Sequence, residues 1–337
     1  MTGIDGLTLL RDGATVTTSG STGRPKRVRL SGAAFRASAA AAAEALGEPG
    51  EWVLALPEHY VAGMNVLARA AHWGRVPRTA VGGPRFSALG FAAVVAGISG
   101  PRYTSLVPVQ LERLLDSAPG LEAIRGFDRV LLGGQAPAPA LLNRARAEGV
   151  AVTVTYGATE TCGGVIWDGL PIGGSATRLV DGIVHLAGSS LADGYVDEAG
   201  EPDPARTAEA FVELDGRRWH RTSDHGELRA GRLTVLGRAD DLIITGGVKV
   251  SLVEVEHAVR ELPGLGDAVV VGVERGAWGV APAVVTAGRE APELEAVRGA
   301  VGERLGPAAR PVALRRLPEI PMLDSGKPDR EAIRRLL

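Results

Sequence analysis

Residues 17–26 read TTSGSTGRPK, a short loop in which hydroxyl side chains and glycines precede a lysine. Hydroxyls and uncovered backbone N–H groups bind polyphosphates, glycine lets the backbone approach the ligand, and lysine adds a positive charge. No Gly-Lys-Ser/Thr sequence leads from this loop into a helix, so it differs from the Walker type of phosphate loop. Composition alone leaves two interpretations open, a phosphate-binding loop and a flexible polar loop.

Predicted strands lie on both sides of this loop. Residues 7–10 and 14–17 flank Arg11-Asp12-Gly13 and predict a hairpin, and a strand resumes at residues 28–30. Ser31 is the predicted N-cap of a helix over residues 33–46, which Gly47 ends.

The pattern then changes twice along the chain. Up to about residue 155, short apolar runs alternate with helical stretches, which predicts a layered α/β domain with parallel strands. The strands are predicted at residues 53–56, 103–107, 130–132 and 150–154, and the helices at 64–73, 87–97, 108–117 and 138–148. From about residue 165 to 237, Asp181-Gly182 and Asp215-Gly216 predict hairpins of an antiparallel β subdomain.

A domain boundary is predicted at residues 238–241, where Arg-Ala-Asp-Asp precedes a new pattern. A helix capped by Ser251 and strands near 268–273, 281–286 and 312–317 predict an α+β unit. The predicted fold class is therefore α/β, with a large N-terminal layered α/β domain that carries an antiparallel β subdomain (1–237). A small C-terminal α+β domain (242–337) follows it.

The composition of the chain excludes several classes of function. The 337 residues contain 37 Lys and Arg against 39 Asp and Glu, so no basic field exists to bind nucleic acid. The single cysteine, Cys162, excludes an intramolecular disulfide and a four-cysteine zinc site. No apolar run reaches the roughly 18 residues of a membrane span, and the first residues lack the pattern of a signal peptide. We therefore expect a cytoplasmic protein.

A second polar segment, YGATET at residues 156–161, follows an apolar strand. Open α/β sheets bind ligands at the carboxyl ends of their strands. Here Tyr156 can stack on a base, Thr159 can bond a phosphate, and Glu160 can hold Mg²⁺ through its hard oxygens. The alternative is a strand-to-loop turn with a surface glutamate.

Three further segments are uninformative when taken singly. Gly133-Gly134-Gln135 is either a surface for a flat ring or a turn. Asp224 is either a ligand of ribose hydroxyls or, with the nearby arginines, part of a surface ion pair. Lys327, in the tail segment Asp324-Ser325-Gly326-Lys327, is by itself an ordinary solvated lysine.

Taken in order, these segments resemble the adenylate-forming superfamily of acyl-CoA synthetases, peptide adenylation domains and luciferases. Residues 18–26 match its form Thr-Ser-Gly-Ser/Thr-Thr-Gly-x-Pro-Lys, and the resemblance extends from about residue 15 to 330. Within the superfamily the chain is most similar to the o-succinylbenzoate–CoA ligases of menaquinone biosynthesis. The stretches that carry this likeness are LPEHYVAG (56–63), YTSLVPVQL (103–111) and YGATETCGG (156–164).

The resemblance implies a two-step reaction with ATP, Mg²⁺ and coenzyme A. A small aromatic carboxylic acid attacks the α-phosphate of ATP and gives an acyl-adenylate and pyrophosphate. The small C-terminal domain then rotates as a lid, and the thiol of coenzyme A attacks the adenylate. The enzyme is thus expected to be an AMP-forming acid–thiol ligase.

The resemblance also implies roles for individual residues. Glu160 holds Mg²⁺, Thr159 contacts the α-phosphate, and Lys327 stabilises the charge that builds up during adenylation. Asp240 is the hinge, and Gly246 and Gly247 line the tunnel for coenzyme A. The remaining nucleotide-binding residues are Thr18, Ser19, Gly20, Ser21, Thr22, Gly23 and Lys26 for the phosphates, Gly134, Gln135 and Tyr156 for adenine, and Asp224 and Arg238 for ribose.

The acid pocket is defined more loosely by the same resemblance. His59 or Tyr60 occupies the place of a histidine in many relatives, and Gly163 and Gly164 leave room for a flat benzoyl ring. Cys162 is interpreted as a small buried residue, since nothing near it in the sequence lowers its pKa. Arg102 is a candidate ligand of the second carboxylate or a surface residue. One wall is expected to contain Ser105, Val107, Pro108 and Gln110.

Two other functions share parts of this pattern. An adenylating enzyme for another aryl or acyl acid, which passes its product to coenzyme A or to a carrier protein, shares every adenylation motif. A catalytically silent nucleotide-binding module is the third reading, although Lys26, Glu160 and Lys327 are all present. Relatives commonly carry more than a hundred additional N-terminal residues, so we expect either a trimmed single chain or a homodimer that covers the exposed flank.

Overall fold

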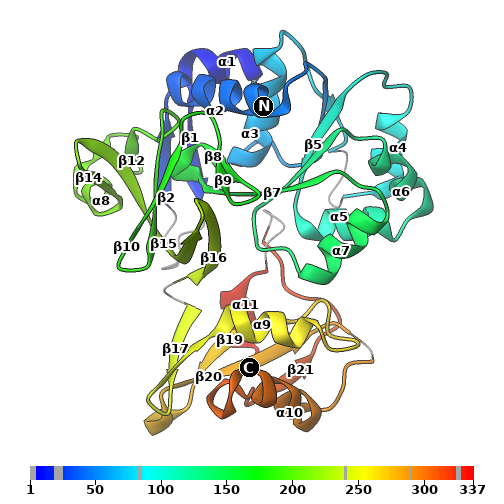
Figure 1. The fold of residues 1–337 in the computed structure, drawn as a ribbon, viewed down its shortest axis with the longest axis vertical. Coiled ribbons are helices and arrows are strands. Elements are labelled where there is room, and N and C mark those ends of the chain that lie inside the picture. The colour runs from blue at the N-terminus through cyan, green and yellow to red at the C-terminus, as the bar shows by residue number, and fades with distance from the viewer. Residues whose placement is uncertain (1–4, 19–25, 82–85, 239–240, 289, 324–327) are drawn as a thin grey trace. The chain divides into compact units, whose positions relative to one another are not determined.

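The computed structural model describes residues 5–18, 26–81, 86–238, 241–288, 290–323 and 328–337 (Figure 1). The chain folds into two compact units. The first contains the residues up to Thr222 together with Leu228–Thr234, and the second contains Ser223–Glu227 and Val235–Leu337. The predicted α/β class, with a large N-terminal part and a small C-terminal α+β part, is confirmed. Rotation about a hinge at residues 238–241 stays a prediction, and Asp240 lies outside the described residues.

A mixed sheet of seven strands forms the centre of the first unit. Strands β3 to β7 run parallel, and β8 and β9 continue the sheet antiparallel. The strand order is β4 (Arg78–Thr79), β3 (Glu51–Leu54), β5 (Arg102–Leu106), β6 (Arg129–Leu132), β7 (Val152–Ala158), β8 (Gly163–Trp167) and β9 (Leu170–Pro171).

Successive residues of these strands enter two different cores. Trp52 and Leu54 pack on one face of β3, whereas Val53 packs on the other, as the twofold repeat of a strand requires. Helices cover both faces, which explains why the strands read as continuous apolar runs. The first core receives α2 (Gly32–Leu46) and α3 (Val61–His72), and the second receives α4 (Ala88–Val95), α5 (Pro108–Leu115), α6 (Ala118–Arg125) and α7 (Pro139–Ala147).

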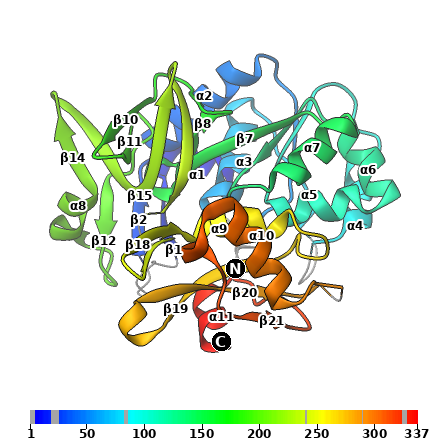
Figure 2. The ribbon, with the colours of Figure 1, turned by 60° about the horizontal axis from the view of Figure 1, so that its bottom comes forward.

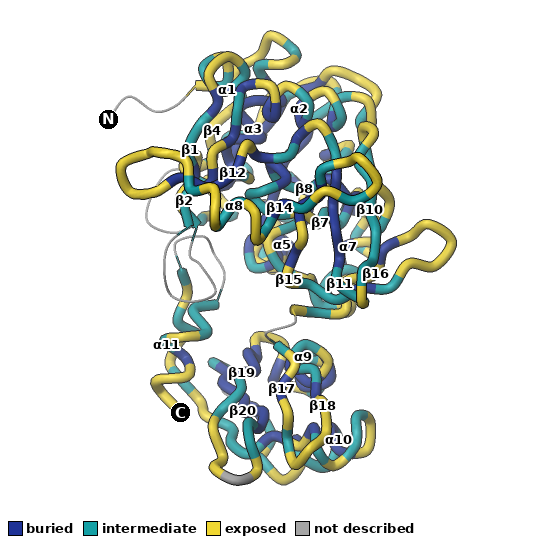
Figure 3. Tube along the Cα trace, turned by 90° about the vertical axis from the view of Figure 1, so that its left-hand side faces the viewer, coloured by how far each residue is buried: buried dark blue, intermediate teal, exposed yellow. Residues whose placement is uncertain are grey.

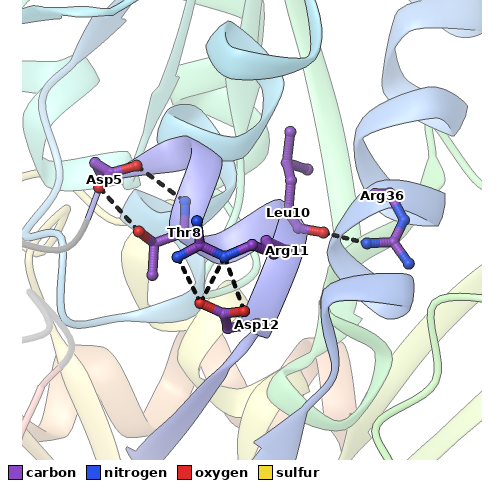
Figure 4. Close-up of polar contacts among 6 residues, drawn as sticks. All are labelled: Asp5, Thr8, Leu10, Arg11, Asp12 and Arg36. Carbon is purple, nitrogen blue, oxygen red and sulfur yellow. Dashed lines mark hydrogen bonds and ion pairs between the residues drawn. The ribbon is translucent and has the colours of Figure 1, made fainter.

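The predicted strand at residues 7–10 is wrong, because these residues form helix α1 (Gly6–Asp12). The Asp5 side chain caps the helix by accepting the Thr8 N–H at 2.9 Å, and Arg11 pairs with Asp12 in the last turn (Figure 4). Gly13, with φ of 76°, ends the helix, so the Asp-Gly pair is a helix end rather than a hairpin turn. Arg36 of α2 donates to the Leu10 carbonyl and ties the two helices together.

Two antiparallel sheets follow, and they belong to the first unit except for residues 223–227 of β15 and 235–238 of β16, which are counted with the second unit. The four-stranded sheet joins β1 (Ala14–Thr18), β2 (Lys26–Leu30), β12 (Gly194–Val196) and β13 (Pro202–Asp203). The other contains β10 (Ala176–Val180), β11 (Ile183–Ala187), β15 (Arg217–Arg229) and β14 (Phe211–Leu214), with β16 (Arg232–Arg238) paired to β15. The predicted hairpin turns are confirmed, since Asp181 and Asp215 adopt φ of 51° and 53° directly before glycine.

The second unit has its own core around a three-stranded sheet. Helices α9 (Leu252–Arg260) and α10 (Leu294–Leu305) cover one face, and α11 (Arg330–Arg335) covers the other (Figure 2). The strands are β19 (Val269–Glu274), β20 (Val280–Thr286) and β21 (Leu314–Arg316), and a hairpin of β17 (Leu242–Thr245) and β18 (Val248–Ser251) precedes them. Most residues of β19 and β20 are buried (Figure 3). Among the residues that the structure describes, no helix has both the length and the apolar character needed to cross a bilayer.

A buried carboxylate connects α9 to the last helix. Glu256, 6% exposed, pairs with Arg260 at 2.8 Å and with Arg330 at 2.7 Å, and it accepts the Val270 N–H at 3.0 Å. Arg330 begins α11, three residues after Lys327 in the sequence. The ion pair therefore holds the start of α11 on the sheet.

Glu256→Ala is expected to destabilise the second unit by about 3–5 kcal/mol, because two partly buried guanidinium groups lose their counter-charge. Hydrogen exchange of the β19 and β20 amides reports this loss locally. The matched control is Glu295→Ala, which removes an ion pair of an 87% exposed side chain with Arg298. Equal protection of these amides in the two variants would contradict the account.

Candidate active site

The carboxyl ends of β5, β6 and β7 lie at one edge of the seven-stranded sheet. Leu106 pairs with Leu132, Leu132 pairs with Val154, and the Gly133 N–H donates to the Leu106 carbonyl at 3.1 Å. This register brings the segments that begin at Gly133 and Tyr156 to the same edge. The sheet therefore gathers three separate stretches of sequence, namely the end of β5 with Ser105, the loop with Gly134 and Gln135, and the turn with Thr159 and Glu160.

A tight turn after β7 presents Thr159 and Glu160. It is a single 3₁₀ turn, Thr159–Thr161, followed by Cys162 in the left-handed region with φ of 54°. The Thr161 hydroxyl accepts the Ala158 N–H at 2.9 Å and contacts the Gly163 carbonyl at 2.8 Å. These bonds fix the turn from inside, so the two residues before Thr161 occupy defined positions.

The peptide carbonyl of Cys162 anchors the turn to two helices. Asn65 of α3 donates its side-chain amide to this oxygen at 2.9 Å, and Ser38 of α2 donates its hydroxyl at 3.2 Å. Ser38 and Asn65 also contact each other at 3.0 Å. All three residues are buried, so each hydrogen bond replaces one that water would otherwise make.

Glu160 is bound at its backbone and at one side-chain oxygen. Its carbonyl accepts the Ala192 N–H at 2.8 Å, and its Oε1 accepts the hydroxyl of Tyr195 at 2.6 Å. Burial, with Glu160 as the next cause, raises the pKa of Tyr195, so this hydroxyl keeps its proton and donates.

The surroundings of Glu160 fit a Mg²⁺ ion that is bound mainly by its substrate. No group of three His, Cys, Asp or Glu side chains with metal-binding geometry occurs among the described residues. A magnesium ion commonly takes one or two carboxylates, several waters and phosphate oxygens. Oε1 of Glu160 accepts the hydroxyl of Tyr195, so Oε2 is the oxygen that would bind such an ion.

Thr18 and Lys26 stand opposite each other at the ends of β1 and β2, and they bracket the hydroxyl-rich loop. The Thr18 hydroxyl donates to the Lys26 carbonyl at 3.5 Å, and the Lys26 ammonium lies 5.8 Å from the centre of the Tyr195 ring. Tyr195 thus lies against both Lys26 and Glu160. The loop residues Ser19, Gly20, Ser21, Thr22 and Gly23 lie outside the described residues, as does Lys327.

Glycines beside the turn leave no space for side chains. A Cβ on Gly157 would lie 2.1 Å from the Gly163 carbonyl oxygen, and one on Gly163 would lie 2.6 Å from the Asn65 amide nitrogen. Gly163 also has φ of 90°, which disfavours any L side chain. The protein's own atoms therefore occupy the space beside Gly157 and Gly163, and room for a flat ring there stays a prediction.

The residues predicted for the acid pocket lie in different surroundings. His59 is exposed, and the centre of its ring lies 4.2 Å from that of Tyr60, with the two ring planes tilted by 45°. Ser105 is buried, and Gln110 bonds the Val107 N–H and the Ala55 carbonyl, so it joins α5 to the end of β3. Arg102 begins β5 and therefore lies at the edge opposite the turn, which removes it as a candidate for the second carboxylate.

The other predicted residues belong to the second unit. Asp224 lies in β15, and Arg238 ends β16, the neighbouring strand. Gly246 and Gly247 form the turn between β17 and β18 with φ of 56° and 83°. A Cβ on Gly246 would lie 3.1 Å from the Trp278 ring, which is 71% exposed.

Two family models match the chain. The model described as AMP-binding enzyme matches residues 14–194, and the model described as AMP-binding enzyme C-terminal domain matches residues 254–327. A protein of Mycobacterium tuberculosis H37Rv named "Probable 2-succinylbenzoate--CoA ligase" is 40% identical over 327 residues, which cover 94% of this chain and 82% of the relative. The chain belongs to the AMP-binding enzyme family, among the 2-succinylbenzoate–CoA ligases.

Other members of the family agree with this assignment. The 2-succinylbenzoate–CoA ligase of Escherichia coli K12 is 31% identical, over 80% of this chain and 57% of the relative. The solved structure of o-succinylbenzoate CoA synthetase (MenE) from Bacillus subtilis, in complex with the acyl-adenylate intermediate OSB-AMP, matches with a TM-score of 0.80 and 25% identity. That match covers 96% of this chain and 69% of the other. A variant of Escherichia coli MenE with bound OSB-AMS matches with a TM-score of 0.76 and 27% identity, over 96% and 68% of the chains.

Sequence reasoning missed one charged residue of this AMP-binding enzyme. Arg69 of α3 is only 6% exposed, and its Nε atom has no hydrogen-bond partner among the described residues. Its guanidinium lies over the Trp52 ring at 5.4 Å and interacts electrostatically with Cys162. Burial lowers the pKa of Arg69 to about 10, so the group is still charged at neutral pH. In the sequence, only the position of Arg69 on an apolar helix face indicated that this arginine is buried.

Cys162 of this enzyme is expected to be unreactive toward iodoacetamide in the native state. Burial raises the pKa of the Cys162 thiol to about 12, so at pH 8.5 the native protein holds about a thousandfold less thiolate than the unfolded chain. Mass spectrometry of protein alkylated with and without urea measures the difference. Native labelling at a rate close to that in urea would contradict the buried position of this turn.

Proposed function

We propose that this chain joins 2-succinylbenzoate to coenzyme A through an acyl-adenylate, with release of pyrophosphate and AMP. The observation that carries the proposal is the pairing of Lys26 and Glu160 around Tyr195, in a chain whose 40% identical relative is named for that reaction. The cytoplasm as the place of reaction and a homodimer as the assembly belong to the same proposal.

In the first step, a carboxylate oxygen of the acid attacks the α-phosphorus of ATP. A new P–O bond forms, the bond to the bridging oxygen of the β-phosphate breaks, and pyrophosphate leaves. Mg²⁺, when bound, neutralises charge on the phosphate oxygens. Lys26 and the loop of residues 18–23 would bind the β- and γ-phosphates, Glu160 would hold the ion, and Thr159 would bond the α-phosphate. Positioning and charge neutralisation are the main contributions to such transfers.

In the second step, the thiolate sulfur of coenzyme A attacks the acyl carbon. The C–S bond forms, the C–O bond to the adenylate breaks, and AMP leaves with the former carboxylate oxygen. Gly246 and Gly247 would line the path of the pantetheine arm, since a side chain there would fill it. The exposed Trp278 ring beside this turn supports the assignment, because a flat apolar surface in water suits a ligand contact.

Adenine and ribose would be bound by residues from several strands. Gly134 and Gln135 would flank the base at the end of β6, and Tyr156 would stack on it. Asp224 and Arg238 of the second unit would bind the ribose hydroxyls.

Arg69 would bind the second carboxylate of 2-succinylbenzoate. A buried charge without a counter-ion is costly, so a buried guanidinium whose Nε has no hydrogen-bond partner among the described residues suits an anionic ligand. The electrostatic effect of Cys162 on Arg69 supports this role, because Gly163 and Gly164, beside which the ring of the acid is proposed to lie, follow Cys162 in the sequence.

Arg69→Met is expected to raise the KM for 2-succinylbenzoate by about 10- to 100-fold, the cost of a lost hydrogen bond to a charged group. The melting temperature of the protein is expected to hold or rise, because the variant removes an unpaired buried charge. Arg129→Met is the matched control, since Arg129 begins β6 at the opposite edge. Unchanged KM values in Arg69→Met would refute this role.

Lys327→Ala is expected to lower adenylation by about 100-fold or more while it leaves thioester formation from preformed adenylate largely intact. The two half-reactions are measured separately, the first as pyrophosphate exchange and the second with synthetic acyl-adenylate and coenzyme A. Lys249→Ala, an exposed lysine of the same unit, is expected to keep adenylation unchanged. Loss of both half-reactions in Lys327→Ala would contradict the proposal that the C-terminal domain adopts a different position for each half-reaction.

The proposed function itself is tested by pyrophosphate release with ATP and Mg²⁺. The acids are 2-succinylbenzoate, benzoate and a fatty acid, each with and without coenzyme A. Turnover that requires both 2-succinylbenzoate and coenzyme A is expected. Turnover with a different acid only would support the adenylating chemistry but refute 2-succinylbenzoate as the substrate. Release of pyrophosphate without consumption of coenzyme A would favour a carrier protein as the acceptor of the acyl group.

A further inference from the structure

We propose that Tyr195 is a positioning residue that sets the carboxylate of Glu160 for the magnesium ion of the ATP complex. The inference rests on the proposed function, because it assigns a role within the same nucleotide site. It concerns a residue that lies 35 positions from Glu160 in the sequence and outside every motif named above.

Tyr195 is held rigidly where it meets Glu160. It lies at the centre of β12, paired with Val28 of β2 on one side and Asp203 of β13 on the other. Its N–H donates to the Thr207 hydroxyl at 2.9 Å, and Thr207 lies in α8 (Pro204–Ala210). The side chain is 3% exposed. The backbone and the burial together leave the ring little freedom.

The hydroxyl of Tyr195 selects one of the two carboxylate oxygens. It donates to Glu160 Oε1 at 2.6 Å, the short distance of a hydrogen bond to an ionised acceptor. A carboxylate on a short turn otherwise rotates freely about its last bonds. With Oε1 bound, the orientation of Oε2 is fixed, and that oxygen is the one left for a cation.

The ring of Tyr195 also faces two cations. The Lys26 ammonium lies 5.8 Å and the Arg206 guanidinium 5.9 Å from the ring centre. The aromatic face attracts cations, while the hydroxyl edge meets the carboxylate. One side chain therefore contacts the carboxylate of the proposed site through its hydroxyl and lies near Lys26 with its ring.

This arrangement differs from that of an ordinary buried tyrosine in the same unit. Tyr103 is also 3% exposed, but its hydroxyl donates to the backbone carbonyl of Glu48 at 2.9 Å. Removal of either hydroxyl deletes one hydrogen bond and keeps the ring. Tyr103→Phe is thus a matched control for the structural cost of Tyr195→Phe.

The test is equilibrium binding of ATP in the absence of any acid, so that no turnover occurs. Affinity is measured by titration calorimetry over a range of Mg²⁺ concentrations and in EDTA, for the wild type, Tyr195→Phe and Tyr103→Phe. We expect the Mg²⁺ concentration for half-maximal enhancement to rise about tenfold in Tyr195→Phe, the usual effect of losing a group that orients a metal ligand. ATP affinity in EDTA and all values of Tyr103→Phe are expected to match the wild type.

A double-mutant cycle with Glu160→Gln separates positioning from a loss of structure. If Tyr195 acts through Glu160, then Tyr195→Phe has no further effect on Mg²⁺ dependence in the Glu160→Gln background. An equal loss of ATP affinity with and without Mg²⁺, or an undiminished effect in that background, would overturn the inference. A wild-type protein that does not bind ATP would overturn the proposed function and this inference with it, whereas failure of the inference alone leaves wild-type ATP binding intact.

Discussion

The hydrogen bonds of Asn65 and Ser38 to the Cys162 carbonyl fix the turn from which the rest of the site is built. At this turn the chain changes from the parallel part of the sheet to the antiparallel part, with Cys162 in the left-handed region. Before Cys162, the turn presents Glu160 to Tyr195 of β12. After it, Gly163 and Gly164 begin β8. One anchored carbonyl thus sets both the nucleotide side and the acid side of the proposed site.

The proposed chemistry is divided between two units with separate cores. The first unit contributes the carboxyl edge of the sheet, Lys26 and Glu160. The second contributes the glycine turn between β17 and β18, and its sequence contains Lys327. Because each unit has its own buried apolar cluster, each can keep its structure while the other changes position. Such a division into two units suits a two-step reaction in which Lys327 is needed for the first step and the glycine turn for the second.

The sequence predicted the layered fold because its strands and helices repeat with clear periods, and Asp-Gly pairs marked two of the hairpins. The same pair at Asp12-Gly13 led to a wrong prediction of a hairpin, because Asp5 caps a helix there and Gly13 ends it. Helix α6 had no separate signal, since residues 118–125 follow α5 after only two residues. Tyr195 and Arg69 were missed for a different reason. Their importance lies in contacts with Glu160 and near Cys162, and no local pattern records a partner 35 or 93 residues away.

The most direct test of the account follows the oxygen atoms of the acid. The protein is incubated with ATP, Mg²⁺, coenzyme A and 2-succinylbenzoate that carries ¹⁸O in its carboxylates, and the products are analysed by mass spectrometry. The account predicts that AMP gains one ¹⁸O atom and that pyrophosphate gains none, because a carboxylate oxygen attacks the α-phosphorus and leaves with AMP. Unlabelled AMP, or label in ADP, phosphate or pyrophosphate, would contradict the acyl-adenylate as the intermediate.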